Sequence, residues 1–130
     1  MTQEMKDLLL RDLCGRLTYG VKLQDDLGDI LPLDYPRRCE TIKSFTQILS
    51  DAIEEYKLRP YLRSMSTMTK EEREEYDLFF SYGEHGWDEY TISDEIPNII
   101  DWLNSHHFDY RGLIKRGLAI EAPIKMYNKN

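Results

Sequence analysis

The sequence predicts a single α+β domain in which a small antiparallel sheet is flanked by helices. Three observations favour this class. Two stretches, one near the N-terminus and one from Ile96 onward, repeat apolar residues at helical spacing. Thr69 and Glu72 have the spacing of a helix capping box, and short alternating segments are typical of strands. An all-α domain is the alternative, because short strands give the weakest signals in one sequence.

The composition indicates one globular domain over residues 1–130. The chain has no internal repeat and no linker that would divide it. Its 24 acidic and 17 basic residues give a formal charge of −7, which repels phosphate backbones and anionic lipid. We therefore expect neither direct nucleic-acid binding nor membrane binding.

Cysteine usage and the N-terminal stretch indicate a cytoplasmic location. Cys14 and Cys39 form no CxxC pair, which is typical of free thiols in a reducing compartment. The N-terminus alternates charge with leucine and so lacks the apolar core of a signal peptide, and no run approaches membrane-spanning length. A thiol on a leucine-rich helix is usually a small core residue, so we expect Cys14 to be buried.

The first helix is predicted to begin after Thr2, a good N-cap residue. Its apolar stripe packs on the core and consists of Met5, Leu8, Leu9, Leu13 and Leu17. The opposite, solvent side carries Lys6, Asp7, Arg11 and Asp12. Gly20 ends the pattern.

Short strands are predicted at 21–23 and 30–33, joined by turn residues that include Gly28. Pro32 places the second strand at a sheet edge, because proline has no N–H to donate. A weaker third strand is predicted around 41–42 and 45–46, where a helix is the alternative. Ser50 is then the expected N-cap of a helix from Asp51 to Tyr56, which Pro60 stops.

The capping box predicts a helix that begins at Thr69 and runs to about Phe80. The side chains that it turns to the core are Tyr76, Phe79 and Phe80. Residues 81–91 contain two glycines and no helical period, which predicts a loop.

The next helix is predicted from Ile96, with Ser93 or Asp94 as its cap and Pro97 in its first turn. Its buried face consists of Ile96, Ile99, Ile100 and Leu103, is continued by His107 and is flanked by Trp102. Residues 109–116 predict another helical turn ended by Gly117, and 118–120 a short strand or extended segment. The final residues, MYNKN, are expected to fray.

Histidines and carboxylates suggest one candidate metal set, which consists of His85, His106, His107 and Asp109. His106 and Asp109 have acceptable ligand spacing, whereas neighbouring His106 and His107 diverge by about 100° on a helix. We favour structural histidines and predict no metal and no other cofactor. Nucleophilic catalysis by Cys14 would need His107 or another base beside it in space, and it is not favoured.

An acidic surface with aromatic residues is the more promising site. Acids are concentrated on the helix from Thr69, and the partner-binding residues that we predict after it are Tyr82, Glu84, Trp87, Asp88, Glu89 and Tyr90. Rings anchor protein interfaces and acids attract basic partners. The expected function is therefore non-enzymatic binding of a protein that is basic or that itself binds nucleic acid. The competing interpretation is a solvated helix face with the loop rings tucked into the core.

Three segments carry a resemblance to a known group of proteins: LLLRDLCGRLTYGVK from Leu8, KLRPYLRSMSTMT from Lys57, and IDWLNSHHFDYRGLIKRGLAIEAP from Ile100. They resemble small uncharacterised proteins of gut Bacteroidales genomes and of their phages and mobile elements. The resemblance implies a bacterial or phage cytosolic setting and a small sheet flanked by helices. It brings no established activity and no catalytic residue. Residues 25–56 depart from the pattern, and we expect individual specificity there. The alternative function is a small metal-dependent hydrolase using the region of His106 and Asp109.

Overall fold

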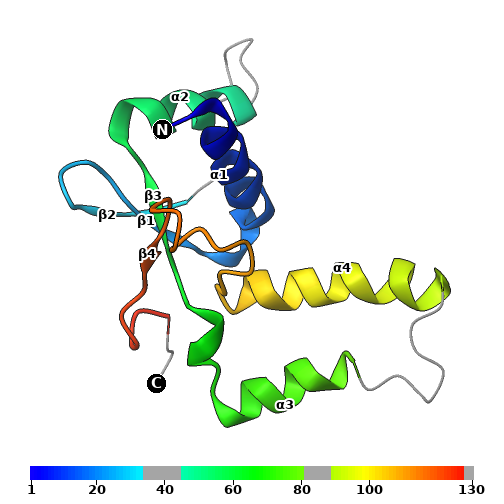
Figure 1. Ribbon diagram of the computed structural model, residues 1–130. Coiled ribbons are helices and arrows are strands. Elements are labelled where there is room, and N and C mark those ends of the chain that lie inside the picture. The colour runs from blue at the N-terminus through cyan, green and yellow to red at the C-terminus, as the bar shows by residue number, and fades with distance from the viewer. Residues whose placement is uncertain (34–44, 81–88, 128–130) are drawn as a thin grey trace.

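The computed structural model describes residues 1–33, 45–80 and 89–127, with the side chains at 45 and 89–95 left out. The predicted α+β class is confirmed (Figure 1). In chain order the elements are α1 (Gln3–Gly15), the 3₁₀ helix η1 (Leu17–Tyr19), β1 (Lys22–Gln24), β2 (Ile30–Pro32), α2 (Phe45–Tyr56), β3 (Arg59–Leu62), the 3₁₀ helix η2 (Met65–Thr67), α3 (Lys70–Leu78), α4 (Glu89–Ser105) and β4 (Ile120–Glu121).

The four strands form one sheet in the order β2-β1-β3-β4. β1 pairs antiparallel with β2 and β3, as predicted for the first half of the chain, whereas β3 pairs parallel with the C-terminal β4, so the sheet as a whole is mixed. β2 is an edge strand, as Pro32 predicts. β3 was not predicted, because Pro60 is typical of a residue that ends a helix rather than of one inside a strand. Pro60 instead lies opposite Leu23 of β1, where it is buried.

The first of two regions, which we call the body, consists of α1, α2, the sheet and the C-terminal segment. Helices α1 and α2 pack against each other and against the sheet (Figure 1). The buried residues that they share with the sheet and C-terminal segment are Leu9, Leu13, Val21, Leu23, Leu33, Leu49, Ile53, Leu58, Leu62, Leu113, Leu118 and Ala119. Removal of this aliphatic surface from water is the main stabilising contribution to the body.

Helix α1 follows the prediction at its start and departs from it near its end. The Thr2 hydroxyl accepts the Met5 N–H, and the apolar stripe faces the core as expected. Asp12, however, is fully buried rather than solvated, because it pairs with the buried Arg16. Cys14 is exposed rather than part of the core.

Helix α2 begins at Phe45, so the strand predicted at 45–46 and the Ser50 cap are both wrong. Ser50 lies inside the helix, between Leu49 and Ile53, whose i,i+4 spacing places both side chains in the body core. The strand predicted at 41–42 lies outside the described residues. The end at Tyr56 is as predicted, and Lys57 follows with a φ of 51°.

The second region, which we call the arm, consists of α3, α4 and the chain between them. The two helices lie side by side and project from the body (Figure 1). The capping box at α3 is confirmed, because Thr69 Oγ1 accepts the Glu72 N–H while a Glu72 carboxylate oxygen accepts the Thr69 N–H. Phe79 packs on the arm's aromatic cluster, but Phe80 is half exposed, contrary to the prediction.

Helix α4 begins at Glu89, seven residues before the expected start at Ile96. Ser93 and Asp94 are therefore helical residues rather than caps, and the loop predicted to reach Thr91 ends sooner. Pro97 lies inside the helix, where its ring removes one backbone hydrogen bond.

The buried face of α4 is narrower than predicted. Ile99 and Leu103 are buried, but Ile96 is 41% and Ile100 37% exposed, and Trp102 is only partly buried. Within the described residues, α3 covers only one side of α4, so the two flanking isoleucines stay outside the contact.

The C-terminal segment makes hydrogen-bonded turns over 109–116, where we predicted another helical turn. His107 ends α4 with a φ of 64°, and Phe108 N–H donates to the Leu103 carbonyl, which together make a Schellman motif. His107 therefore leaves the apolar stripe instead of continuing it. Gly117 closes a later turn, and β4 follows as the predicted short strand. Within MYNKN, Tyr127 is hydrogen-bonded to the sheet rather than frayed, and residues 128–130 lie outside the described residues.

Candidate functional site

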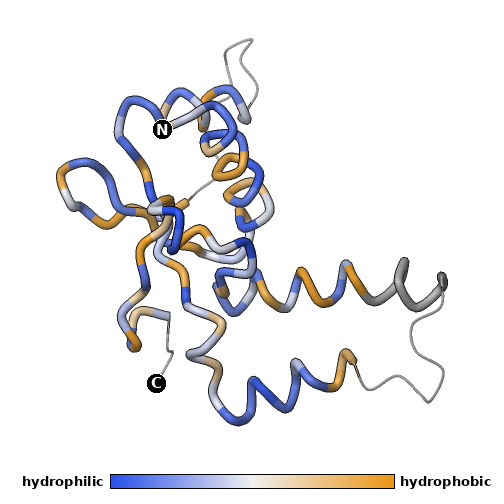
Figure 2. The backbone as a smooth tube through the Cα atoms, in the orientation of Figure 1, coloured by the Kyte–Doolittle hydropathy of each residue, from blue (hydrophilic) through white to orange (hydrophobic). Residues whose placement is uncertain are grey.

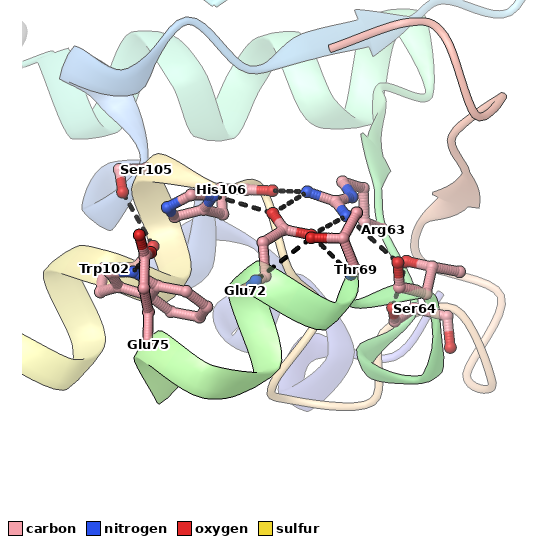
Figure 3. A network of polar contacts seen from close by, with 9 residues as sticks. Arg63, Ser64, Thr69, Glu72, Glu75, Trp102, Ser105 and His106 are labelled. Atoms are coloured by element: carbon pink, nitrogen blue, oxygen red, sulfur yellow. Dashed lines mark hydrogen bonds and ion pairs between the residues drawn. The ribbon is translucent and has the colours of Figure 1, made fainter. Parts of the chain in front are cut away.

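The arm is fixed to the body by a polar cluster, the clamp, which consists of Arg63, Glu72 and His106 (Figure 3). Arg63 follows β3, Glu72 lies in the first turn of α3, and His106 follows α4. The Arg63 guanidinium donates two hydrogen bonds of 2.7 and 2.6 Å to the Glu72 carboxylate. His106 Nδ1 lies 3.0 Å from the same carboxylate. The Glu72 carboxylate thus joins α3 to the residue that follows β3 and to the residue that follows α4.

The electrostatics of the clamp follow from its donors. The Arg63 hydrogen bonds lower the pKa of Glu72 to about 2, although partial burial opposes the shift. Glu72 is therefore ionised at neutral pH. An ionised carboxylate can only accept hydrogen bonds, so His106 Nδ1 carries the proton in this contact.

Aromatic rings fill the space between the helices of the arm. The Trp102 ring centroid lies 4.3 Å from that of His106, 5.8 Å from Phe108 and 5.7 Å from Tyr76. Its Nε1 donates to Glu75 at 3.0 Å. The Arg63 guanidinium lies over the Phe108 ring at 4.3 Å. Large rings therefore bridge α3 and α4 where the described residues include few buried aliphatic side chains.

A groove of about 730 Å³ runs between the clamp and the C-terminal segment. Its lining residues are Arg63, Thr67, Thr69, Glu72, Ser105, His106, His107, Ala122, Pro123, Ile124 and Tyr127. Arg63 already donates to Glu72 and to two backbone carbonyls, so its charge is largely neutralised there. The groove therefore has no marked charge.

His107 and Tyr127 lock the C-terminal segment to the sheet. Their rings stack with centroids 3.7 Å apart. The Tyr127 hydroxyl donates to the Tyr61 carbonyl at 2.6 Å and accepts the Lys22 N–H at 2.9 Å, so it bridges β1 and β3. Burial lowers the pKa of His107 to about 4, with Arg16 adding to the shift, and burial raises the pKa of Tyr127 to about 12. Both rings are neutral at pH 7.

The histidines and carboxylate of the candidate metal set have separate structural contacts. His106 faces Glu72, and His107 stacks on Tyr127. The two Asp109 carboxylate oxygens accept the N–H groups of Leu113 and Ile114, at 2.9 Å each. Over residues 1–33, 45–80 and 89–127, no group of three His, Cys, Asp or Glu side chains could hold a metal ion. His85 lies outside those ranges.

A buried ion pair in the body, between Asp12 and Arg16, was not predicted from the sequence. Arg16 Nε donates to Asp12 at 2.8 Å, Arg16 Nη2 donates to the Phe108 carbonyl at 2.7 Å, and Arg111 lies 3.3 Å from Asp12. Both paired side chains are fully buried. The i,i+4 spacing of Asp12 and Arg16 was the available signal, although such pairs usually lie on a solvated face.

In the sequence, the predicted partner-binding residues lie between α3 and α4 and in the first turn of α4. Tyr82, Glu84, Trp87 and Asp88 lie outside the described residues. Glu89 and Tyr90 lie in the first turn of α4, but their side chains are outside the described set. Their grouping into one surface stays a prediction.

The sequence of the arm is strongly acidic, and the described part of the arm exposes apolar side chains as well. Eleven of the chain's 24 acidic residues lie between Lys70 and Ser105, but only two of its 17 basic ones, so this span has a formal charge of −9. The other residues carry 13 acidic and 15 basic side chains, a charge of +2. Figure 2 shows α3 as mostly hydrophilic and α4 as more apolar. The exposed large apolar side chains of the arm are Leu78, Phe80, Ile96 and Ile100.

No helix within the described residues is long and apolar enough to cross a membrane. No protein-family model matches the chain, and no curated protein or solved structure is significantly similar to it.

Proposed function

We propose that this chain is a non-enzymatic module of a bacterial or phage cytosol that binds another protein through the arm. One observation carries the proposal: the span from Lys70 to Ser105, which comprises two projecting helices and the chain between them, has a formal charge of −9, while the remainder of the chain carries +2. A concentrated negative field attracts a basic partner and speeds association. The partner is therefore a basic protein or a protein that itself binds nucleic acid.

We assign the aromatic part of this surface to the segment between the two helices and to the first turn of α4. The residues assigned to it are Tyr82, Glu84, Trp87, Asp88, Glu89 and Tyr90. Rings give desolvated contact area, whereas carboxylates at the rim steer the approach of the partner. Exposed apolar side chains on both helices of the arm support a contact that buries apolar surface in addition to its electrostatic attraction. The exposed thiol of Cys14 is compatible with a reducing cytosol.

Binding kinetics with a partner isolated from the native host test the proposal. Trp87→Ala should speed dissociation, whereas Asp88→Lys with Glu89→Lys should slow association and flatten its dependence on salt. Lys115→Glu with Lys125→Glu, two exposed bases of the body, is the matched control and should leave both rates nearly unchanged. Unchanged rates in the arm variants would refute binding through this surface.

The second candidate, a small metal-dependent hydrolase, has one supporting feature. Glu72 orients His106 at the edge of a groove, as an acid–base catalyst requires. Asp109 is less suited to a ligand role, because both carboxylate oxygens already accept backbone N–H groups. Elemental analysis separates the candidates: stoichiometric zinc, manganese or iron that survives dialysis would favour the hydrolase.

A further inference from the structure

An exposed apolar stripe runs along α4 beside the acidic surface of the arm. Ile96 and Ile100 are one helical turn apart, so their side chains lie on the same side of the helix. They are 41% and 37% exposed, whereas neighbouring Ile99 and Leu103 are buried. The stripe therefore lies next to the contact with α3 rather than within it.

The arm that bears this stripe has an excess of acidic side chains. Glu71, Glu74 and Asp77 on α3 and Asp101 on α4 are exposed acids. Against them the whole span from Lys70 to Ser105 offers only two bases, Lys70 and Arg73. An occupant of the stripe consequently gains from positive charge beside its own apolar contacts.

The geometry of the stripe restricts the shape of its occupant. Two apolar side chains at i and i+4 match the anchor spacing of an amphipathic helix that lies against another helix. A strand could not extend a sheet here, because the backbone N–H and C=O groups of a helix interior are already paired. A second copy of the chain is a poorer fit, since its body carries a charge of only +2 and its arm is as acidic as the first.

We propose that the α4 stripe of Ile96 and Ile100 docks an amphipathic helix of the partner, whose apolar face is bordered by lysine or arginine. This inference rests on the proposed function and names the class of partner segment. Acids steer the basic border, and the isoleucines supply the desolvated contact.

Fluorescence anisotropy with a labelled leucine–lysine peptide, about five helical turns long, tests the docking. Two further peptides are compared: one has glutamate in place of every lysine, and the other has the lysine count of the first but scrambled leucines. Ile96→Ser with Ile100→Ser is the test variant of the full chain. Ile30→Ser is the matched control, because Ile30 is 55% exposed on the edge strand β2 of the body.

We expect wild type and Ile30→Ser to bind the amphipathic basic peptide equally, the double variant to bind at least about tenfold more weakly, and the acidic peptide not to bind. Thermal unfolding by circular dichroism checks that the double variant is folded, as its exposed positions lead us to expect. Equal binding by the double variant overturns the inference. Equal binding of the scrambled peptide also overturns it, while it leaves the proposed attraction for basic partners intact. Binding of neither basic peptide overturns the inference, whereas the proposed function is tested separately by the arm variants Trp87→Ala and Asp88→Lys with Glu89→Lys. If sedimentation shows a dimer that is lost only in the double variant, the occupant of the stripe is a second copy of the chain, and the proposed partner helix is overturned.

Discussion

The body and the arm are built on different amounts of buried surface. Among the described side chains, the body core has twelve buried residues, all aliphatic, whereas the cluster that the arm forms with the start of the C-terminal segment has three, namely Ile99, Leu103 and Phe108. The arm compensates with stacked rings and with a carboxylate that accepts from both Arg63 and His106. A thin, charged pair of helices cannot stabilise itself by burial alone. The body therefore maintains the fold, whereas the arm exposes a surface that is available for contacts.

The largest effect is expected from the buried ion pair of the body. Asp12→Asn leaves the Arg16 guanidinium buried without its counter-charge, and it should lower the free energy of unfolding by about 3–5 kcal/mol. Urea unfolding followed by circular dichroism measures the loss. Asp7→Asn, on the exposed side of the same helix, is the control and should change the stability little. A small loss at Asp12 would mean that the pair does not hold the body together.

In the arm, Leu103→Ala should cost about 2–5 kcal/mol, because Leu103 is 5% exposed and packs in the cluster with Phe108. Hydrogen exchange distinguishes the two regions: amides of α3 and α4 should exchange faster than those of α1 in this variant. Ile100→Ala on the exposed side of α4 is the control. Equal acceleration of α1 would show that the arm and the body unfold as one unit.

Acidification should weaken the contact between the C-terminal segment and the sheet through His107. Its pKa is about 4 in the folded protein and 6.5 in the unfolded chain, so the unfolded state binds more protons between these values. This contribution to stability is complete above pH 6.5, is lost as pH falls to 4, and amounts to about 1–3 kcal/mol. His107→Asn keeps a residue that tolerates positive φ and should remove this slope from stability measured against pH. An unchanged slope would assign it to other groups.

A smaller effect at lower pH is expected from the clamp. The folded pKa of Glu72 is about 2 against an ordinary value of 4.5, so its contribution is present above pH 4.5 and is lost as pH falls toward 2. Glu72→Gln should lower the stability at pH 7 by about 1–2 kcal/mol and flatten the acid limb in that window. Fluorescence of Trp102 in a Trp87→Phe background reports the arm. Glu71→Gln, exposed one residue earlier, is the control.

Local sequence determined the elements whose signals are contained within a few residues. Thr2 and Thr69 cap α1 and α3 because their own hydroxyls reach N–H groups three positions on. The stripe of Leu9 and Leu13 and the edge position of β2 followed from spacing and from one proline. These contacts are local, so no knowledge of the rest of the chain was needed.

Tertiary structure decided which residues of each pattern are buried, and so determined much of the candidate site. Asp12 is buried with Arg16, which donates to the Phe108 carbonyl, and with Arg111 beside it, whereas Pro60 lies buried in β3 opposite Leu23 of β1. Glu72, His106 and Arg63 are brought together from three separate elements. Ile96 and Ile100 are exposed because α3 covers only one side of α4. A sequence pattern fixes the direction of a side chain on its own helix, whereas burial depends on what the distant chain places against it.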